Sequence, residues 1–446
     1  MAELAYLSVA DAHEALTKKR VSAVELTQYY LDRITKLDPK VRAVLTRCDD
    51  EALAVAALVD AKIAAGEEIG LLEGIPYTAK DMFLTKSIRT TAASKILDNF
   101  IPPFSATVIE KLDDAGAIMI AKVNQDEFAH GGSTENSGYH PTHNPWDSSR
   151  VPGGSSGGSA AAAAADFGIF SLGTDTGGSI RQPAAYCGVT GFKPTYGAVS
   201  RYGVVAMGSS FDCIGPIARS AEDAAIVMDV IAGRDAKDST TIELKRSQFA
   251  QQLTKPLSGK KVGVITEYIT HLEDPSRIVF DQANSELEQL GLEVVEVSLP
   301  TIEKALAAYY VLTPSEISSN LSRYDGIRYG HSAEKAHSLI EVYNQSRDEG
   351  FGGEVKRRVL TGTYALSAGY YDAYYKKAMQ VRSMMREEFE KAFEKVDFLI
   401  GPSTPTPAFR LGENSDPITM YLEDIMTVAA NIVGVPAVSV PAGFVD

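Results

Sequence analysis

The first 65 residues follow a helical pattern of apolar positions. Ser22 and Glu25 form an S-x-x-E capping box, which is typical of a helix N-terminus. The Asp38–Pro39 step predicts the end of this helix, because proline disfavours helical backbone at the residue before it. An alanine-rich segment predicts a second helix over 51–65 that stops at Gly66. The apolar stripe of the first helix consists of Leu26, Tyr30, Ile34 and Leu37.

From Gly74 onward the pattern changes to short apolar runs separated by helical segments. Runs at 118–120 and 169–172 predict buried strands, and 107–115 predicts a helix. Strands that alternate with helices are typical of a parallel or mixed sheet with both faces covered. The sequence therefore predicts an α/β fold.

The second half begins with a charged segment, 235–255, that we expect to be an exposed crossover. A strand, a helix and a strand are predicted after it, which is the pattern of a βαβ unit. Two long helices are then expected. The predicted elements are 261–266, 278–290, 292–297, 305–322 and 370–394.

Composition narrows the class of protein. The chain has 446 residues, of which 45% are hydrophobic and 23% charged, as in ordinary globular proteins. Neither a basic leader with an apolar run nor a stretch of about 20 apolar residues is present, so we expect a cytoplasmic protein. The three cysteines form no CxxC pair, which disfavours a disulfide framework or a zinc site. A net charge of −15 predicts that any RNA contact is made mainly by a partner.

Two loops rich in glycine and serine carry the chemistry. They span 153–159 (GGSSGGS) and 173–181 (GTDTGGSIR). Glycines let backbone amides approach a ligand closely, as an oxyanion hole requires. The G-x-S-x-G pattern of the α/β-hydrolase elbow fits both 153–157 and 154–158, and this double match shows how weak that pattern is. A phosphate loop is disfavoured because the required lysine is missing.

A serine nucleophile needs a base, and the sequence offers histidines and one lysine. We expect His130, His140 and His143 to be surface or satisfied loop histidines. Lys80 ends an otherwise apolar strand within 74–81. Burial there would favour its neutral, proton-accepting form, although a lysine at a strand end more often reaches solvent.

Together, the segment 74–81 and the two glycine–serine loops resemble the amidase signature family. The resemblance implies a large mixed β-sheet covered by helices on both faces. It implies Ser179 as the nucleophile, Lys80 as the general base and Ser155 as the bridge between them, often next to a cis peptide bond. The oxyanion hole would consist of the backbone amides of Thr176, Gly177, Gly178 and Ser179.

Further segments narrow the resemblance to one branch of that family, the A subunits of tRNA-dependent amidotransferases. These segments are 318–330, 354–358 and 369–375. Glutamine carries an α-carboxylate and an α-ammonium, so a selective pocket needs a cation and an anion. By resemblance the cation is Arg358, with Arg357 as the alternative register, the anion is Asp424, and Tyr310 lines the pocket wall.

The resemblance implies an enzyme that hydrolyses glutamine and supplies ammonia for the amidation of Glu-tRNA(Gln), with Asp-tRNA(Asn) left open. Its partners would be the B and C subunits, and ATP and Mg²⁺ would be used by a partner, so we expect no cofactor or metal in this chain. The alternatives are a stand-alone amidase of broader substrate range and a non-catalytic assembly subunit.

We expect one amidase domain over 1–446, made of an N-terminal helical segment (1–66), a signature core (74–230) and the remaining sheet, helices and pocket (231–446). Because the family usually continues past 438–443, we expect a truncated C-terminus.

Overall fold

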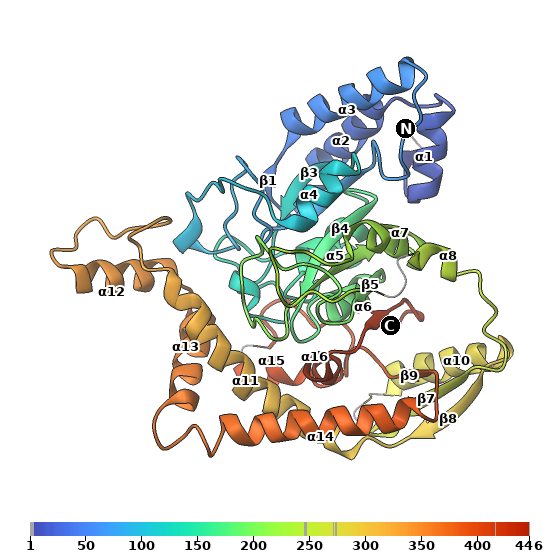
Figure 1. Ribbon diagram of the computed structural model, residues 1–446. Coiled ribbons are helices and arrows are strands. Elements are labelled where there is room, and N and C mark those ends of the chain that lie inside the picture. The colour runs from blue at the N-terminus through green and yellow to red at the C-terminus, as the bar shows by residue number, and fades with distance from the viewer. Residues whose placement is uncertain (1–3, 245–247, 271, 273, 415, 446) are drawn as a thin grey trace.

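The computed structural model describes residues 4–244, 248–270, 272, 274–414 and 416–445. It contains a seven-stranded sheet with the order β1-β3-β2-β4-β6-β5-β10. A three-stranded sheet with the order β8-β7-β9 lies apart from it (Figure 1). The strands of the large sheet are β1 (Val44–Arg47), β2 (Pro76–Lys80), β3 (Ile118–Val123), β4 (Phe170–Asp175), β5 (Thr190–Lys193), β6 (Cys213–Ala218) and β10 (Ala437–Ser439).

The large sheet is mixed, as predicted. Strand β2 pairs in parallel with β3 and β4, whereas β4 with β6, β6 with β5 and β5 with β10 pair antiparallel. Every residue of β2, β4 and β6 is buried, so both faces of the sheet centre are covered. The helices around this core are α4 (Thr107–Asp114), α5 (Gly157–Ala164), α6 (Arg181–Cys187) and α7 (Ala221–Ile231).

The N-terminal segment is helical as predicted, with α1 (Val9–Thr17), α2 (Ala23–Val41) and α3 (Asp49–Ala64). The capping box is present, since the amide of Glu25 donates to the Ser22 hydroxyl and the amide of Ser22 to the Glu25 carboxylate. The predicted end at Asp38–Pro39 is wrong. The helix runs through Pro39, and the Asp38 carboxylate accepts amide hydrogen bonds from Ala43 and Val44, which stabilises the chain just past the helix end.

The predicted βαβ unit is confirmed by parallel pairing of β7 (Lys261–Ile265) with β8 (Glu293–Val297) around α10 (Asp274–Gln289). Strand β9 (Phe398–Ile400) pairs in parallel with the other edge of β7. The expected crossover 235–255 contains α8 (Phe249–Gln252), and its residues 245–247 lie outside the described residues. The short helix α9 (Thr266–Ile269) follows β7.

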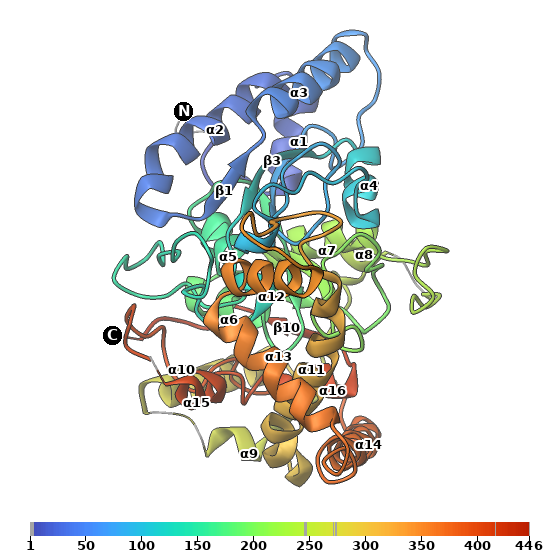
Figure 2. The same ribbon diagram turned by 90° about the vertical axis from the view of Figure 1, so that its left-hand side faces the viewer.

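The long helices lie between β8 and β9 in the chain, and α11 and α13 lie side by side (Figure 2). Helix α11 packs against both α13 and α14. The predicted start of the last long helix at Tyr370 is wrong, because Gly369 adopts φ +89° and the chain turns before the helix begins at Tyr375. The helices of this region are α11 (Ala305–Asn320), α12 (Leu339–Gly350), α13 (Gly353–Leu366), α14 (Tyr375–Phe393), α15 (Pro417–Leu422) and α16 (Val428–Val433).

Short 3₁₀ turns complete the described architecture: η2 (Lys95–Leu97), η3 (Glu127–Ala129), η4 (Pro300–Lys304) and η5 (Leu321–Arg323). Across the described residues, no helix combines the length and apolar character needed to cross a membrane.

Candidate active site

Lys80 lies at the carboxyl end of β2, in the centre of the large sheet, with no exposed surface. Its Nζ donates hydrogen bonds to the hydroxyls of Ser155 (2.7 Å), Ser156 (2.9 Å) and Thr174 (2.9 Å). The serines come from the loop before α5, and Thr174 comes from the neighbouring strand β4. The three hydroxyl groups thus reach the amino group of Lys80 from positions 75 or more residues further along the chain.

The charge state of Lys80 is set by burial. Loss of hydration lowers the pKa of Lys80 to about 7, and the surrounding carboxylates of Asp126, Asp175 and Asp212 raise it only in part. Within the described part of the chain, Lys80 forms no ion pair with a carboxylate. A neutral amine that can accept a proton is therefore well populated at neutral pH.

The Ser155 loop is packed so closely that only glycine fits beside it. The Gly154–Ser155 peptide bond is cis, as the resemblance implied. A Cβ atom added at Gly154 would lie 2.1 Å from the Asp126 carboxylate and 2.6 Å from the amide nitrogen of Ser133. The next residue, Ser156, donates its amide to the carbonyl of Ser179 at 3.1 Å, which joins the two glycine–serine loops.

Ser179 lies in the loop after β4 and is partly exposed, unlike the fully buried Ser155. No hydrogen bond joins the hydroxyls of Ser155 and Ser179 among the described residues. The amide of Gly178 donates to the Asp175 carboxylate at 2.9 Å. By contrast, the backbone amides of Thr176, Gly177 and Ser179 donate no hydrogen bond to any described residue, so these donors remain available.

Asp175 fixes the shape of the glycine–serine loop 173–181. Its carboxylate accepts the amides of Gly178 and Ile180 and forms an ion pair with Arg181 at 3.0 Å. Asn431 of α16 adds a hydrogen bond of 2.9 Å. Burial alone would raise the pKa of Asp175, but the Arg181 charge and these hydrogen bonds lower it to about 2. The carboxylate is therefore ionised throughout the physiological range.

A second charged cluster lies between α11, α13 and α15. The guanidinium carbon of Arg358 is 4.7 Å from the ring centroids of both Tyr310 and Tyr421. The Tyr310 hydroxyl donates to Asp424 at 2.6 Å. Burial raises the pKa of Asp424 to about 7, against the opposing effects of Tyr310 and Arg358. The structure thus brings a guanidinium, a carboxyl group and an aromatic wall together.

Arg357 is placed differently from its neighbour. Its side chain is 48% exposed and pairs with Glu354, whereas that of Arg358 is 5% exposed. Glu354 also accepts from Arg358 Nε at 2.7 Å and from the Tyr421 hydroxyl at 2.8 Å. Successive residues of a helix point in different directions, and only Arg358 faces the cluster.

Comparison with known proteins agrees with this geometry. The sequence model of the family described as Amidase matches residues 25–446. The chain belongs to the amidase family. The resemblance seen in the motifs is thereby confirmed.

Relatives of this amidase are similar over nearly their whole length. The A subunit of the glutamyl-tRNA(Gln) amidotransferase of Heliobacterium modesticaldum is 55% identical over 97% of this chain and 90% of the relative. The crystal structure of the protein of the same name from Thermotoga maritima is 42% identical, with a TM-score of 0.80 over 99% of this chain and 89% of that one. The peptide amidase of Stenotrophomonas maltophilia is 33% identical, with a TM-score of 0.81 over 98% of this chain and 91% of that one.

Several residues of the amidase site were missed in the sequence. Ser156 and Thr174 share the Lys80 ammonium with Ser155, and Glu354 holds Arg358. A signal was available for Asp175, because an acidic residue directly before a glycine-rich turn is positioned to accept the amides of that turn.

The histidines only partly match their expected positions. His140 and His143 are both partly buried, in agreement with loop positions. His130 departs from the expectation, because it has no exposed surface and its Nε2 forms no hydrogen bond to any described residue. The apolar neighbours Phe128 and Ala129, which are also buried, draw this loop into the interior.

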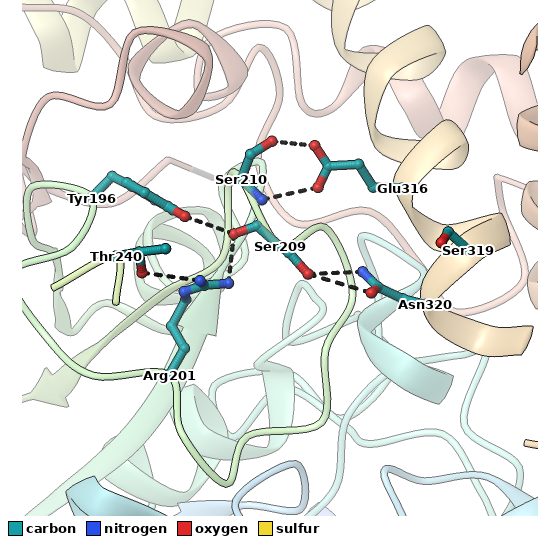
Figure 3. A pocket seen from close by; sticks show the side chains of 8 residues that line it. All are labelled: Tyr196, Arg201, Ser209, Ser210, Thr240, Glu316, Ser319 and Asn320. Atoms are coloured by element: carbon teal, nitrogen blue, oxygen red, sulfur yellow. Dashed lines mark hydrogen bonds between the residues drawn. The ribbon is translucent and has the colours of Figure 1, made fainter. Parts of the chain in front are cut away.

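A separate pocket of about 310 Å³ lies between the loop 196–210, Thr240 and α11 (Figure 3). Hydrogen bonds join the residues that line this pocket, including one of 2.9 Å from the Ser210 amide to Glu316. It contains none of the candidate catalytic residues. Among the described residues, no cluster of three or more histidine, cysteine, aspartate or glutamate side chains could hold a metal.

Proposed function

We propose that this amidase is the glutaminase subunit of a tRNA-dependent amidotransferase. It hydrolyses glutamine to glutamate and ammonia, and partner subunits use the ammonia to amidate Glu-tRNA(Gln), with Asp-tRNA(Asn) as a second candidate acceptor. The observation that carries the proposal is the placement of buried Arg358 and of Asp424 around Tyr310, which suits an amino acid bearing both charges. The relatives named as A subunits of glutamyl-tRNA(Gln) amidotransferases support it.

In this proposal Ser179 is the nucleophile. Its Oγ attacks the carboxamide carbon of glutamine and gives its proton to the Ser155 hydroxyl, which passes its own proton to neutral Lys80. The hydrogen bond of 2.7 Å between Lys80 and Ser155 supports the second transfer. The proton then returns by the same route to the departing nitrogen, which leaves as ammonia. Water releases glutamate from Ser179 through the same steps.

The developing oxyanion needs donors that are not already engaged. We assign this role to the backbone amides of Thr176, Gly177 and Ser179. The amide of Gly178, expected to share the role, donates to Asp175 and fixes the shape of the loop. A Cβ atom added at Gly177 would lie 2.5 Å from the Tyr309 hydroxyl, so a side chain there would displace the loop from α11.

The substrate pocket follows from the second cluster. Arg358 binds the α-carboxylate, Asp424 binds the α-ammonium, and Tyr310 orients Asp424. Arg357 is not assigned a contact, because it is exposed and paired with Glu354.

We propose that residues 1–446 act as one amidase domain, since Asn431 of α16 contacts Asp175 of the signature core. The chain uses no cofactor of its own, the B and C subunits are its partners, and a partner uses ATP and Mg²⁺. We place the reaction in the cytoplasm, in keeping with three cysteines that are all free thiols.

The experiment is an assay of ammonia release from glutamine and from simple amides, with and without the partner subunits. We expect strong preference for glutamine and loss of activity in Ser179→Ala with retention of the fold. The matched control is Ser383→Ala, a serine on the exposed side of α14. Equal turnover of glutamine and simple amides would favour a stand-alone amidase instead.

A further inference from the structure

The amino group of Lys80 contacts three hydroxyl groups, and the proposed mechanism uses only that of Ser155. The other two belong to Ser156 and Thr174, which are both buried and each lie 2.9 Å from Nζ. A hydroxyl group has one proton to donate and two lone pairs that can accept. The other partners of each hydroxyl therefore decide whether it donates to Lys80 or accepts from it.

The hydroxyl of Ser156 is fully engaged. Its proton is donated to the carbonyl oxygen of Thr174 at 3.0 Å. One lone pair accepts the backbone amide of Thr174 at 3.3 Å, and the other faces Lys80. Because the only proton of Ser156 is used on Thr174, this hydroxyl accepts from Lys80 and has no proton to give it.

The hydroxyl of Thr174 is oriented in the same sense. It donates to the sulfur of buried Met82 at 3.5 Å, so it too accepts from Lys80. A thioether is a weak acceptor, and this orientation is held less firmly than that of Ser156. The hydroxyl of Ser155, by contrast, contacts no described residue other than Lys80. Its proton is the one that is not committed elsewhere.

These contacts fix the direction of the amine. Neutral Lys80 has two N–H bonds and one lone pair. Ser156 and Thr174 accept the two N–H bonds, which leaves the lone pair directed at the third neighbour, Ser155, at 2.7 Å. Ser155 then donates its proton to Lys80, and its oxygen keeps lone pairs that can receive the proton of Ser179.

We propose that Ser156 and Thr174 are positioning residues that hold the two N–H bonds of neutral Lys80 and so aim its lone pair at Ser155. This inference rests on the proposed function, in which Lys80 is the base. Ser156 and Thr174 act through Lys80 and transfer no proton themselves. The backbone amide of Ser156, which donates to the carbonyl of Ser179, has a separate role that substitution of the side chain leaves in place.

The first test is the turnover of glutamine by the complex with its partner subunits above about pH 8, where Lys80 is neutral. Thr174→Val replaces the hydroxyl by a methyl group of similar shape, and Ser156→Ala removes the other acceptor. Each should lower kcat about ten- to a hundredfold, because a misdirected lone pair meets Ser155 less often in the reactive geometry. KM should stay within about twofold, and Thr174→Ser, which keeps the hydroxyl, should retain most of the wild-type kcat.

The pH profile separates positioning from damage to the fold. The protonated amine loses more than the neutral amine when an acceptor is removed, because hydrogen bonds from a charged donor are stronger. Both variants should therefore lower the pKa of Lys80 and move the acid limb of kcat down by about half to one pH unit. Loosened packing that admits water would instead raise this pKa. The carboxylates of Asp126, Asp175 and Asp212, which also act on Lys80, are the same in every variant.

The matched controls are Thr78→Val and Ser171→Ala. These residues are buried in β2 and β4, and their hydroxyls form a hydrogen bond of 2.8 Å with each other. Neither control should change kcat or the acid limb. Wild-type kcat and acid limb in both Thr174→Val and Ser156→Ala would overturn the inference. An acid limb that moves upward, or equal losses in the controls, would overturn it as well.

A simple amide assayed in parallel distinguishes this inference from the proposed function. If the wild-type complex hydrolyses the simple amide and not glutamine, the proposed function fails, and the same comparison of variants is made on the simple amide. A second measurement needs no turnover. In protein with ¹³Cε-labelled lysine, the Lys80 resonance, assigned by its loss in Lys80→Arg, should titrate at a lower pH in Thr174→Val and Ser156→Ala than in wild type. An unchanged or higher titration midpoint would contradict the inference.

Discussion

The two sheets of this amidase use similar interactions in different surroundings. In the large sheet, β2, β4 and β6 are completely buried, and the Asp175–Arg181 ion pair at their edge has side-chain exposures of 0% and 6%. In the small sheet, the ends and faces of β7 and β8 reach solvent. The Lys261–Glu293 pair there has nearly the same length, 2.9 Å against 3.0 Å, but is about half exposed.

The difference explains why we assign the chemistry to the large sheet. Water screens an exposed pair and competes for its hydrogen bonds, so such a pair contributes little. A buried polar group must find partners inside the protein, and this requirement fixes its geometry and shifts its pKa. The depressed pKa of Lys80 and the fixed shape of the glycine–serine loop 173–181 are both consequences of burial.

The strongest loss of activity is expected at Lys80. Lys80→Ala should lower kcat for glutamine by about 10⁴-fold or more, as loss of a proton-transfer residue does in other serine hydrolases. The assembled complex should still amidate its tRNA when ammonium is supplied, because the base acts only in making ammonia. Lys261→Ala on the small sheet is the matched control and should leave both reactions unchanged. Failure of the mutant complex with ammonium would assign Lys80 a structural role.

A pH profile tests the same contrast between buried and exposed lysines. The pKa of Lys80 is lowered to about 7, so the amine is neutral above this pH and protonated below it. At saturating glutamine, kcat should therefore fall about tenfold per pH unit below 7. Protonation of Asp424, whose pKa is also about 7, should raise KM in the same range. A kcat that is independent of pH between about 5 and 8 would contradict the base assignment.

The next effect concerns stability. Asp175→Asn leaves the buried guanidinium of Arg181 without its counter-charge and should lower the free energy of unfolding by about 3–5 kcal/mol. Because the pKa of Asp175 is about 2, below its ordinary value of 3.8, its contribution is present above about pH 4 and is lost as the pH falls through 2. Urea unfolding measures the change, with Asp281→Asn of the exposed Arg277 pair as control. Equal small changes in both variants would show that burial does not distinguish the pairs.

A smaller effect is expected in the substrate pocket. Asp424→Asn keeps an acceptor for Tyr310 but removes the negative charge. The loss of about 1.5–3 kcal/mol of interaction energy should lower kcat/KM for glutamine roughly 10- to 150-fold. Hydrolysis of an uncharged amide should change little. Asp372→Asn, whose side chain is 81% exposed, is the control. Parallel losses on both substrates would make Asp424 a structural residue.

The weakest effect belongs to the small sheet. Glu293→Ala removes the exposed partner of Lys261 and should change the free energy of unfolding by about 0.2–1 kcal/mol. The difference should shrink in high salt, which screens exposed charges. Urea titrations at low and high ionic strength test this, and a loss of several kcal/mol would remove the contrast between the two sheets.

Local signals along the chain were enough to predict most elements and the motifs. The capping box at Ser22 marked the start of α2, and apolar periodicity indicated the βαβ unit, because both signals act within a few residues. The two glycine–serine loops indicated the family without any structure. Boundaries at Pro39 and Tyr370 were misplaced, since a proline in the last turn and a turn around Gly369 depend on neighbouring contacts.

Which polar side chains meet depends on the three-dimensional packing. Lys80 and Ser155 contact each other across 75 positions, and Asp175 and Asn431 across 256, separations over which no local pattern carries information. Arg358 lies on the buried face of α13 and Arg357 on the exposed face, which only the folded structure shows. The packing of η3 likewise buries His130. Burial is a property of the folded chain, and burial sets the charge of Lys80, the low pKa of His130 and the strength of the Asp175 pair.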